Sequence, residues 1–260
     1  MASEISTNKV YVVTGANRGL GLGLTKTLLS RPSTTVIATV RNDEAAASLQ
    51  ADHLKMTDTG QGSALHIIQL DFTAALSPDE IFEGFSKTVS TIDHIDVLIN
   101  NAGFAAPMHP ATQTPAEDLR ASFEVNTIAP LMVFQAFWPL LQKSPSGAPK
   151  VILISSSVGS IRAQEPMTGG AYGPSKAAAN WLVRALHLQN EDKGLVAVAL
   201  HPGWVQTRNG HFAAKEWNYP SDPPDTVEDS VKGMLEVIDG ATRENISGEF
   251  VAQTGEVIPW

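Results

Sequence analysis

The chain of 260 residues contains no cysteine, which excludes a disulfide framework, a thiol nucleophile and thiolate ligands for a metal. Its seven histidines are scattered and form no closely spaced pair, so we expect no metal site. No apolar run approaches the roughly 18 residues that a membrane span requires. Residues 1–9 have neither the apolar core of a signal peptide nor the composition of a transit peptide. We therefore expect a cytoplasmic protein that does not span a membrane.

Basic residues are in the minority, because 18 Lys and Arg against 27 Asp and Glu give a net charge of −9. This balance argues against partners that are themselves anionic, such as nucleic acid or an acidic membrane surface. A few basic residues gathered in one place could still hold a small anion. Hydrophobic residues make up 43% of the chain, enough for one large core. We expect residues 1–260 to form a single domain.

A glycine-rich turn follows the first predicted strand. Residues 10–13 are apolar and lead directly into residues 14–21, after which leucines recur at helical spacing. Glycine permits a tight turn and a close approach, and the start of the helix offers free N–H groups to a diphosphate. The order strand, turn, helix predicts a dinucleotide site. The expected contacts are Gly15, Asn17, Arg18, Gly19, Leu20 and Gly21.

The residue after the second predicted strand is basic. Residues 34–40 form a β-branched run, and Arg41 follows it. In dinucleotide-binding folds an acidic residue here binds the ribose 2′-hydroxyl group, whereas a basic residue can accept the 2′-phosphate of NADP. Arg18 could close on the same phosphate, so NADP(H) is favoured over NAD(H). Asp43 and Glu44 leave room for NAD(H), but negative charge also suits the start of the following helix.

Further strands are predicted by short apolar or β-branched runs at residues 65–70, 95–99, 151–154, 195–200 and 250–252. Strands that alternate with helices in this rhythm predict an α/β fold: a doubly wound parallel sheet of seven strands with helices on both faces. Ligands bind such sheets at the carboxyl ends of the strands. Polar residues follow three of these ends, namely Asp71, residues 100–103 and residues 155–157.

Tyr172 and Lys176 are four residues apart in a predicted helix, so their side chains would lie on one face. A cation beside a phenol would lower the Tyr172 pKa from its ordinary value of about 10, which suits proton transfer. The serines just before this pair could donate to a carbonyl oxygen. Ordinary explanations are also open: a surface tyrosine stacked on a lysine stem, and serines that cap a turn. Asn126, within the apolar helical stretch 116–142, is either a satisfied core amide or part of a site.

The chain resembles the short-chain dehydrogenase/reductase family from Lys9 to its end. Six motifs occur in the family's order: Thr14-Gly15-x-x-x-Gly19-x-Gly21, Asn100-Asn101-Ala102-Gly103, Asn126, the serine run, Tyr172-x-x-x-Lys176 and Pro202-Gly203-x-Val205-x-Thr207. The glycine spacing is similar to that of the dehydrogenase/reductase branch. Residues 171–176, 201–207 and 247–260 are similar to fungal ketoreductases of the norsolorinic acid type and to carbonyl reductases.

The resemblance implies a Rossmann domain that binds NADP(H) and carries out hydride transfer. Tyr172 would donate the proton, and Lys176 would lower the Tyr172 pKa and hold the ribose. Ser156 would donate to the carbonyl oxygen, with Ser157 as its rival, and Asn126 would hold a water that relays protons. Family members commonly associate through the helices that hold Asn126 and Lys176, which makes a homodimer or a homotetramer possible, whereas the features similar to carbonyl reductases favour a smaller assembly. The resemblance also implies cofactor contacts from Asp71, Asn101, Ala102, Gly103, Tyr172, Lys176, Pro202, Gly203, Val205 and Thr207.

Residues 208–225 have no clear pattern and contain several aromatic side chains and prolines. Long irregular segments in compact domains often close over a site, so we predict a substrate lid at about 204–225. The lid would form a broad aromatic pocket for an apolar or aromatic ketone, although these aromatic side chains could equally pack the lid onto the body. The candidate substrate contacts are Ser157, Phe104, Met167, Trp204, His211, Phe212 and Trp217.

These expectations combine into an NADP(H)-dependent enzyme that reduces a small-molecule ketone, of a polyketide-like kind used in secondary metabolism, to a secondary alcohol. Two alternatives stay open. An isomerase or cyclase on the same scaffold would use the dinucleotide structurally and would show no net oxidation of it. A non-catalytic NADP sensor would have no need of Tyr172, Lys176 and the serines.

Overall fold

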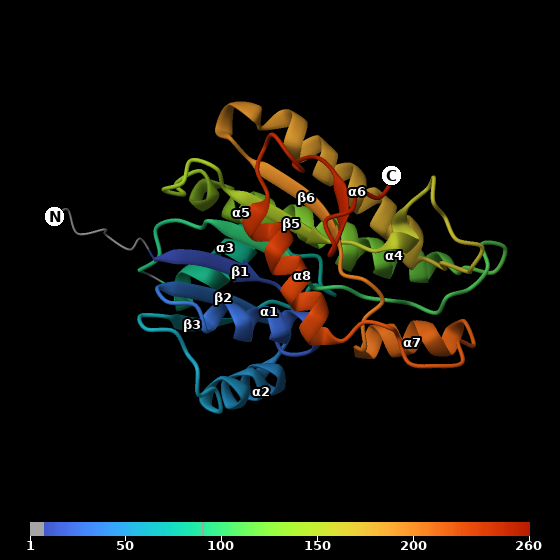
Figure 1. Ribbon diagram of the computed structural model, residues 1–260, viewed down its shortest axis with the longest axis horizontal. Helices are drawn as coiled ribbons and strands as arrows, with labels where there is room; N and C mark the ends of the chain where they lie inside the picture. The colour runs from blue at the N-terminus through green and yellow to red at the C-terminus, as the bar shows by residue number, and fades with distance from the viewer. Residues whose placement is uncertain (1–7, 90) are drawn as a thin grey trace.

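The computed structural model describes residues 8–89 and 91–260 and contains one parallel sheet of seven strands. The strands lie in the order β3-β2-β1-β4-β5-β6-β7, which confirms the predicted doubly wound topology (Figure 1). Because the strand order reverses between β1 and β4, a crevice opens there at the carboxyl ends. The bounds are β1 (Lys9–Val13), β2 (Thr34–Val40), β3 (Ala64–Gln69), β4 (Val97–Asn100), β5 (Lys150–Ile154), β6 (Val196–His201) and β7 (Phe250–Ala252).

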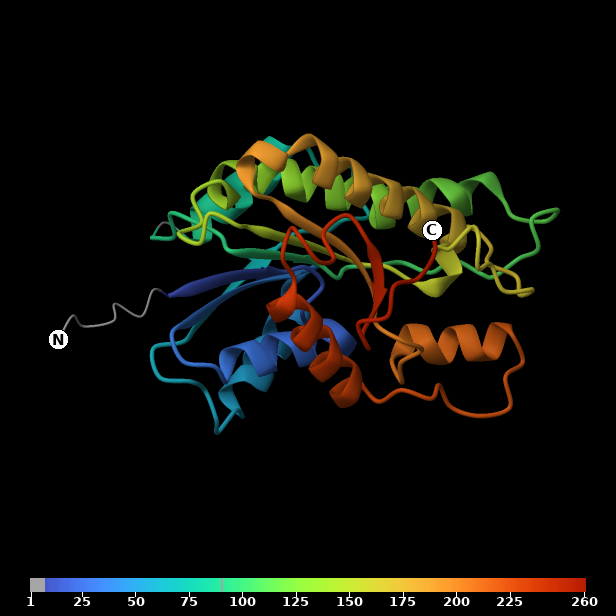
Figure 2. The ribbon, with the colours of Figure 1, turned by 45° about the horizontal axis from the view of Figure 1, so that its top comes forward.

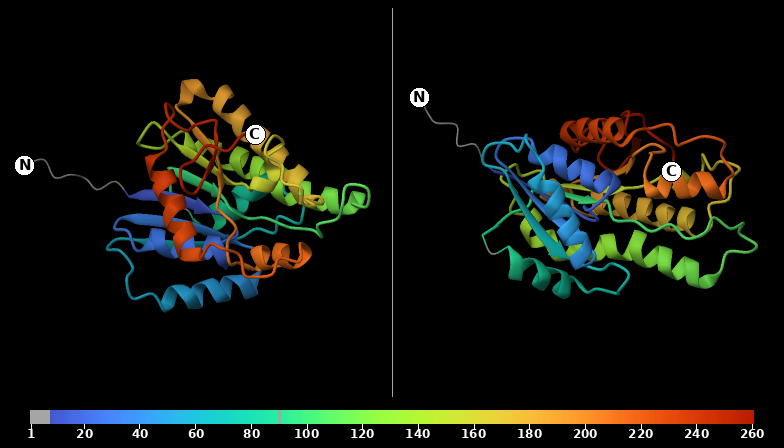
Figure 3. Two further views of the ribbon diagram at one scale, coloured as in Figure 1. Left: turned by 45° about the vertical axis from the view of Figure 1, so that its right-hand side comes forward. Right: turned by 90° about the horizontal axis from the view of Figure 1, so that it is seen from below.

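Helices cover both faces of the sheet, as Figures 2 and 3 show. Successive strand residues point to opposite faces, so Val10 and Val12 pack with α3, α5 and α6, whereas Tyr11 and Val13 pack with α1, α2 and α8. The strands are buried on both sides, which explains their nearly continuous apolar sequences. The helix bounds are α1 (Gly19–Leu29), α2 (Asp43–Leu54), α3 (Pro78–Thr88), α5 (Ala129–Leu141), α6 (Tyr172–Gln189) and α8 (Val227–Gly240). Among the described residues, no helix has both the length and the apolarity to cross a bilayer.

The stretch 116–142, predicted as one helix, is three segments. It begins as α4 (Ala116–Phe123), passes through one wide turn of π-helix, η1 (Glu124–Ile128), and continues as α5. Asn126 lies in that turn with its side chain buried. Such π-turns often mark functional sites, because the extra residue re-aims the neighbouring side chains.

The segment 208–225 is not wholly irregular, so this part of the prediction was wrong. Residues Arg208–Glu216 form a helix, α7, whose first turn is capped where the Thr207 hydroxyl accepts a hydrogen bond of 3.1 Å from the Gly210 N–H group. The helix buries a narrow face of small residues, Gly210, Ala213 and Ala214. A face of this kind carries little apolar signal, which is why the sequence pattern did not indicate a helix. In Figure 1, α7 lies beyond the carboxyl edge of the sheet.

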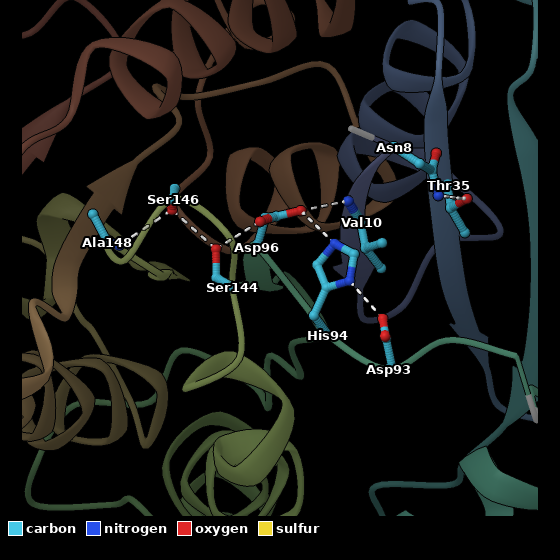
Figure 4. Close-up of polar contacts among 9 residues, drawn as sticks. All are labelled: Asn8, Val10, Thr35, Asp93, His94, Asp96, Ser144, Ser146 and Ala148. Carbon is cyan, nitrogen blue, oxygen red and sulfur yellow. Dashed lines mark hydrogen bonds and ion pairs between the residues drawn. The ribbon is translucent and has the colours of Figure 1, made fainter. Parts of the chain in front are cut away.

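The opposite, amino-terminal edge of the sheet is held by a polar network around Asp96 (Figure 4). The buried Asp96 carboxylate accepts hydrogen bonds from the Val10 N–H group at 2.8 Å and from the Ser144 hydroxyl group at 2.6 Å. His94 lies between two carboxylates, with Nε2 3.4 Å from Asp96 and Nδ1 2.9 Å from Asp93. The network joins β1, β4 and the loop before β5. It therefore fixes the strands whose far ends form the crevice.

Candidate active site

A cavity of about 920 Å³ lies at the carboxyl ends of the strands. Its wall is built from the loops after β1, β2, β3, β4, β5 and β6, together with the starts of α6 and α7. Sites of this depth and position are typical of ligand binding in open α/β sheets. It brings together all the predicted cofactor contacts: Gly15, Asn17, Arg18, Gly19, Leu20, Gly21, Arg41, Asp71, Asn101, Ala102, Gly103, Tyr172, Lys176, Pro202, Gly203, Val205 and Thr207.

The glycine-rich turn has the shape of a phosphate cradle. A Cβ atom at Gly21 would lie 2.2 Å from the Gly15 carbonyl oxygen, so no other residue fits there. Gly15 has a φ of +66°, a conformation that side chains disfavour. The Thr14 hydroxyl oxygen accepts hydrogen bonds from the N–H groups of Asn101 and Ala102 at 3.0 and 2.9 Å, which fastens the turn to the loop after β4. These residues fit the diphosphate of a dinucleotide.

The cavity carries an excess of positive charge in an otherwise acidic protein. Four cationic side chains line it, Arg18, Arg41, Arg208 and Lys176, against two carboxylates, Asp71 and Glu165. Partial burial lowers the pKa of Arg18, and repulsion from Arg208 and from Arg41 lowers it further. The Asp71 pKa is lowered mainly by hydrogen bonds from Thr73, with a smaller effect of Arg41. Such a wall suits a ligand with several negative charges.

The acidic residues that left room for NAD(H) do not face the cavity. Asp43 and Glu44 form the first turn of α2, as predicted, and the Asp43 carboxylate accepts a hydrogen bond of 2.6 Å from the Gln69 side chain. Neither residue lines the cavity wall, whereas Arg41 does. The charge beside the expected ribose is therefore positive, which favours a 2′-phosphate.

Tyr172 and Lys176 lie on one face of the first turn of α6, with the Lys176 ammonium nitrogen 5.6 Å from the centre of the Tyr172 ring. The ammonium group is buried and donates a hydrogen bond of 2.8 Å to the Ile154 carbonyl oxygen. Burial lowers the Lys176 pKa to about 8. Burial raises the Tyr172 pKa to about 12, against a smaller lowering by the Ser156 side chain. The predicted lowering of the Tyr172 pKa was wrong, because the phenol is buried and burial disfavours its charged form.

Ser156 and Ser157, in the loop after β5, make different contacts. The Ser156 side chain interacts with the Tyr172 phenol, and its oxygen also accepts a hydrogen bond of 3.3 Å from the Val158 N–H group at the start of a 3₁₀ turn, η2 (Ser157–Gly159). Ser157 contributes its backbone, since its N–H group donates to Nδ1 of His201 at 3.2 Å. Burial lowers the His201 pKa to about 4, so the ring is a neutral acceptor at physiological pH. The geometry around Tyr172 thus favours Ser156.

Asn126 lies beneath the cavity and is not on its wall. Its amide oxygen accepts a hydrogen bond from the Phe104 N–H group, and its amide nitrogen donates to the Phe104 carbonyl oxygen, both at 2.8 Å. The amide nitrogen also donates to the Ser175 hydroxyl group at 3.0 Å. The side chain therefore fixes the loop after β4 against α6. A role in holding a proton-relaying water stays a prediction.

One end of the cavity is aromatic. Trp204 packs edge-to-face against Trp217 and at a tilt against Tyr219, with ring centres 5.5 and 4.4 Å apart. The Trp217 indole N–H group donates a hydrogen bond to the Thr168 carbonyl oxygen at 2.9 Å. This packing joins α7 and the loop after it to the loop before α6. Phe212 does not line the cavity, so its assignment was wrong; it lies on α7 between residues that do. The predicted substrate contacts on the wall are Ser157, Phe104, Met167, Trp204, His211 and Trp217.

Three ionisable residues on the wall were missed by the sequence reasoning: His201, Arg208 and Glu165. The sequence could have indicated the first two, because His201 and Arg208 directly flank the motif 202–207. His201 is the last residue of β6, and Arg208 is the first residue of α7. Glu165 lies in a long loop whose course no local pattern predicts.

Comparison with known proteins agrees with the site. A family model described as short chain dehydrogenase matches residues 9–217. Norsolorinic acid ketoreductase of Aspergillus parasiticus is 38% identical over 96% of this chain and 91% of its own length. Short-chain dehydrogenase RED3 of Pyricularia oryzae is 36% identical over 98% of this chain and its full length, 100%.

Solved structures of carbonyl reductases share the fold. The NADPH-bound carbonyl reductase from chicken fatty liver has a TM-score of 0.81 and 33% identity, over 98% of this chain and 99% of that chain. Carbonyl reductase Sniffer of D. melanogaster has a TM-score of 0.82 and 29% identity, over 98% of this chain and 100% of that chain. A match of this extent, over a fold and a cavity of this kind, places the chain in the short-chain dehydrogenase family.

Proposed function

We propose that this protein is an NADP(H)-dependent reductase that converts a ketone into a secondary alcohol. The observation that carries the proposal is that Tyr172 lines the cavity wall, interacts with the Ser156 side chain and has the Lys176 ammonium nitrogen 5.6 Å from the centre of its ring. The positive wall around Arg18 and Arg41 supports NADP(H) as the dinucleotide. The NADPH-bound carbonyl reductase, at 33% identity, supports the same cofactor.

The nicotinamide of bound NADPH supplies the hydride, so the protein has to orient the ketone and manage one proton. Ser156 donates a hydrogen bond to the carbonyl oxygen and stabilises the negative charge that develops there. Tyr172 then gives that oxygen its phenol proton. A pKa of about 12 keeps Tyr172 protonated at neutral pH, which is the form that a donor needs. Lys176 holds the ribose and places a positive charge beside the phenolate that forms.

The aromatic end of the cavity supports an apolar or aromatic ketone as substrate. Met167, Trp204 and Trp217 line this end and present large apolar surfaces there. The relative from Aspergillus parasiticus is named a norsolorinic acid ketoreductase, which supports a polyketide-like ketone used in secondary metabolism. α7 and the loop after it form one side of this end and would serve as the lid.

A panel of aromatic and aliphatic ketones tests the proposal, with absorbance of the reduced nicotinamide as the measurement. We expect NADPH to be consumed in proportion to the alcohol formed, with aromatic ketones turned over faster. An isomerase or cyclase would convert its substrate without net oxidation of NADPH. A sensor would bind NADPH and consume none with any ketone. Either of these outcomes would replace the reductase proposal.

A further inference from the structure

Three arginines line one side of the cavity, and Arg18 is the middle one. Repulsion from Arg208 and then from Arg41 lowers the Arg18 pKa, so both are close enough to act on it. Within residues 8–89 and 91–260, none of the three makes an ion pair within 4 Å. The carboxylates on the wall are Asp71, which faces Arg41, and Glu165. Like charges gathered without partners in this way predict a polyanionic ligand.

Arg208 stands at an unfavourable position in its helix. It is the first residue of α7, and the first turn of that helix contains no acidic residue. The N-terminal end of a helix carries partial positive charge, so a cation there destabilises the helix, and repulsion from Arg18 adds to the cost. Residues that break a local rule in this way are typical of functional sites.

The position of Arg208 in the fold indicates which phosphate group of the dinucleotide it would contact. Arg41 follows β2, on the side of β1 where this fold binds the adenosine ribose. Arg208 follows β6, on the other side of β1. Its neighbour Thr207 touches the glycine-rich turn, since a Cβ atom at Gly19 would lie 3.3 Å from the Thr207 methyl carbon. Arg208 is thus next to the turn that cradles the diphosphate, whereas Arg41 lies on the ribose side of β1.

We propose that Arg208 binds the diphosphate of NADP(H), whereas Arg41 serves the 2′-phosphate and Arg18 lies between the two. The inference rests on the proposed use of this dinucleotide. Because α7 also carries His211 and leads into Trp217, the contact joins the cofactor to the substrate end of the cavity. The bound diphosphate thereby compensates for the charge that Arg208 brings to the start of α7.

Equilibrium binding of NADPH and NADH, measured by calorimetry, tests this assignment. Arg208→Gln should weaken both dinucleotides by the same factor, about tenfold for the loss of one charge-assisted contact. Arg41→Ala should weaken NADPH alone, because NADH lacks the 2′-phosphate. Lys215→Gln is the matched control, since it removes a charge from the same helix at an exposed position away from the cavity wall, and it should leave both affinities unchanged.

Thermal melting without dinucleotide gives a second readout. Arg208→Gln should melt no lower than the wild type, because the change removes a cation from the start of α7. Unchanged affinities, a loss confined to NADPH, or a melting temperature well below that of the wild type would each overturn the assignment. Failure of the proposed function would give different results. The wild-type protein would bind neither dinucleotide, or Arg41→Ala would leave its preference for NADPH over NADH unchanged.

Discussion

Lys176 carries its charge in a place that water hardly reaches. Its ammonium group is buried, and burial lowers the Lys176 pKa from 10.5 to about 8. Between these two pH values the unfolded chain holds a proton that the folded chain has released. The contribution of Lys176 to the free energy of unfolding therefore rises with pH across that window, and is least favourable below pH 8. The site holds a cation at neutral pH at the expense of stability.

This cost can be measured against Lys176→Met, which buries no charge. The advantage of the methionine variant in free energy of unfolding should shrink by about 3 kcal/mol between pH 7 and pH 10, since each unit of pKa shift corresponds to about 1.4 kcal/mol. Urea unfolding of both proteins at the two pH values gives the difference. A difference that does not change with pH would mean that Lys176 titrates near its ordinary value.

Ser156 and Ser157 provide a matched pair of substitutions. Ser156→Ala should lower kcat for ketone reduction by about 10²-fold to 10³-fold, because it removes the hydroxyl group beside the Tyr172 phenol. Ser157→Ala should change kcat only slightly, because alanine keeps the N–H group that bonds to His201. Steady-state rates with one good substrate decide between them. The opposite order would make Ser157 the catalytic serine.

At the scale of elements, the turn between β1 and α1 requires a residue without a side chain at position 21. Gly21→Ala would place its Cβ atom 2.2 Å from the Gly15 carbonyl oxygen, so the turn must move. We expect a loss of about 1–3 kcal/mol in stability, the usual cost of overpacking, and weaker NADPH binding. Gly240→Ala is the control, since nothing lies within 4 Å of its Cβ position and it should be neutral or slightly stabilising. Chemical unfolding and NADPH titration measure both effects, and equal behaviour of the two variants would contradict the cradle.

The sheet was predictable because its signals are local. Buried parallel strands are continuous apolar runs, and residues 34–40 were predicted with the bounds that β2 has. The turn 14–21 was predictable because glycine is required there for steric reasons. The cofactor wall followed from the rule that ligands bind at the carboxyl ends of parallel strands.

Other features depend on contacts that the sequence does not display. The break at η1 arises where Asn126 bonds to the Phe104 backbone, 22 positions away. α7 is stabilised by a cap and by a face of small residues, so it lacks apolar periodicity. The pKa of Tyr172 depends on its burial, which the spacing between Tyr172 and Lys176 does not reveal.

At the scale of the whole molecule, the long helix α6 leaves apolar side chains uncovered. The Trp181 side chain is 68% exposed and that of Leu188 is 59% exposed, seven positions along the same helix. α6 packs beside η1, where Ile128 is also exposed. An apolar surface of this kind is one that association between chains would cover, so a homodimer or a homotetramer stays a prediction.

Trp181→Glu should therefore lower the molar mass of the particle in solution to that of one chain, 27.7 kDa. A buried charge at the centre of an interface opposes association. Light scattering coupled to size-exclusion chromatography gives the mass. Ile161→Glu is the control, because Ile161 is 76% exposed in a loop outside α6. Wild-type protein that runs as a single chain would contradict the expected assembly.

The whole account depends on Tyr172 as the proton donor in a cavity whose NADPH contacts come mostly from other residues. The most direct test compares Tyr172→Phe with the wild type in two measurements, the rate of NADPH consumption with a ketone and the NADPH dissociation constant. We predict a rate lowered by about 10²-fold to 10⁴-fold, the usual contribution of a positioned acid, with little change in NADPH affinity. A Tyr172→Phe variant that reduces ketones at close to the wild-type rate would contradict the account.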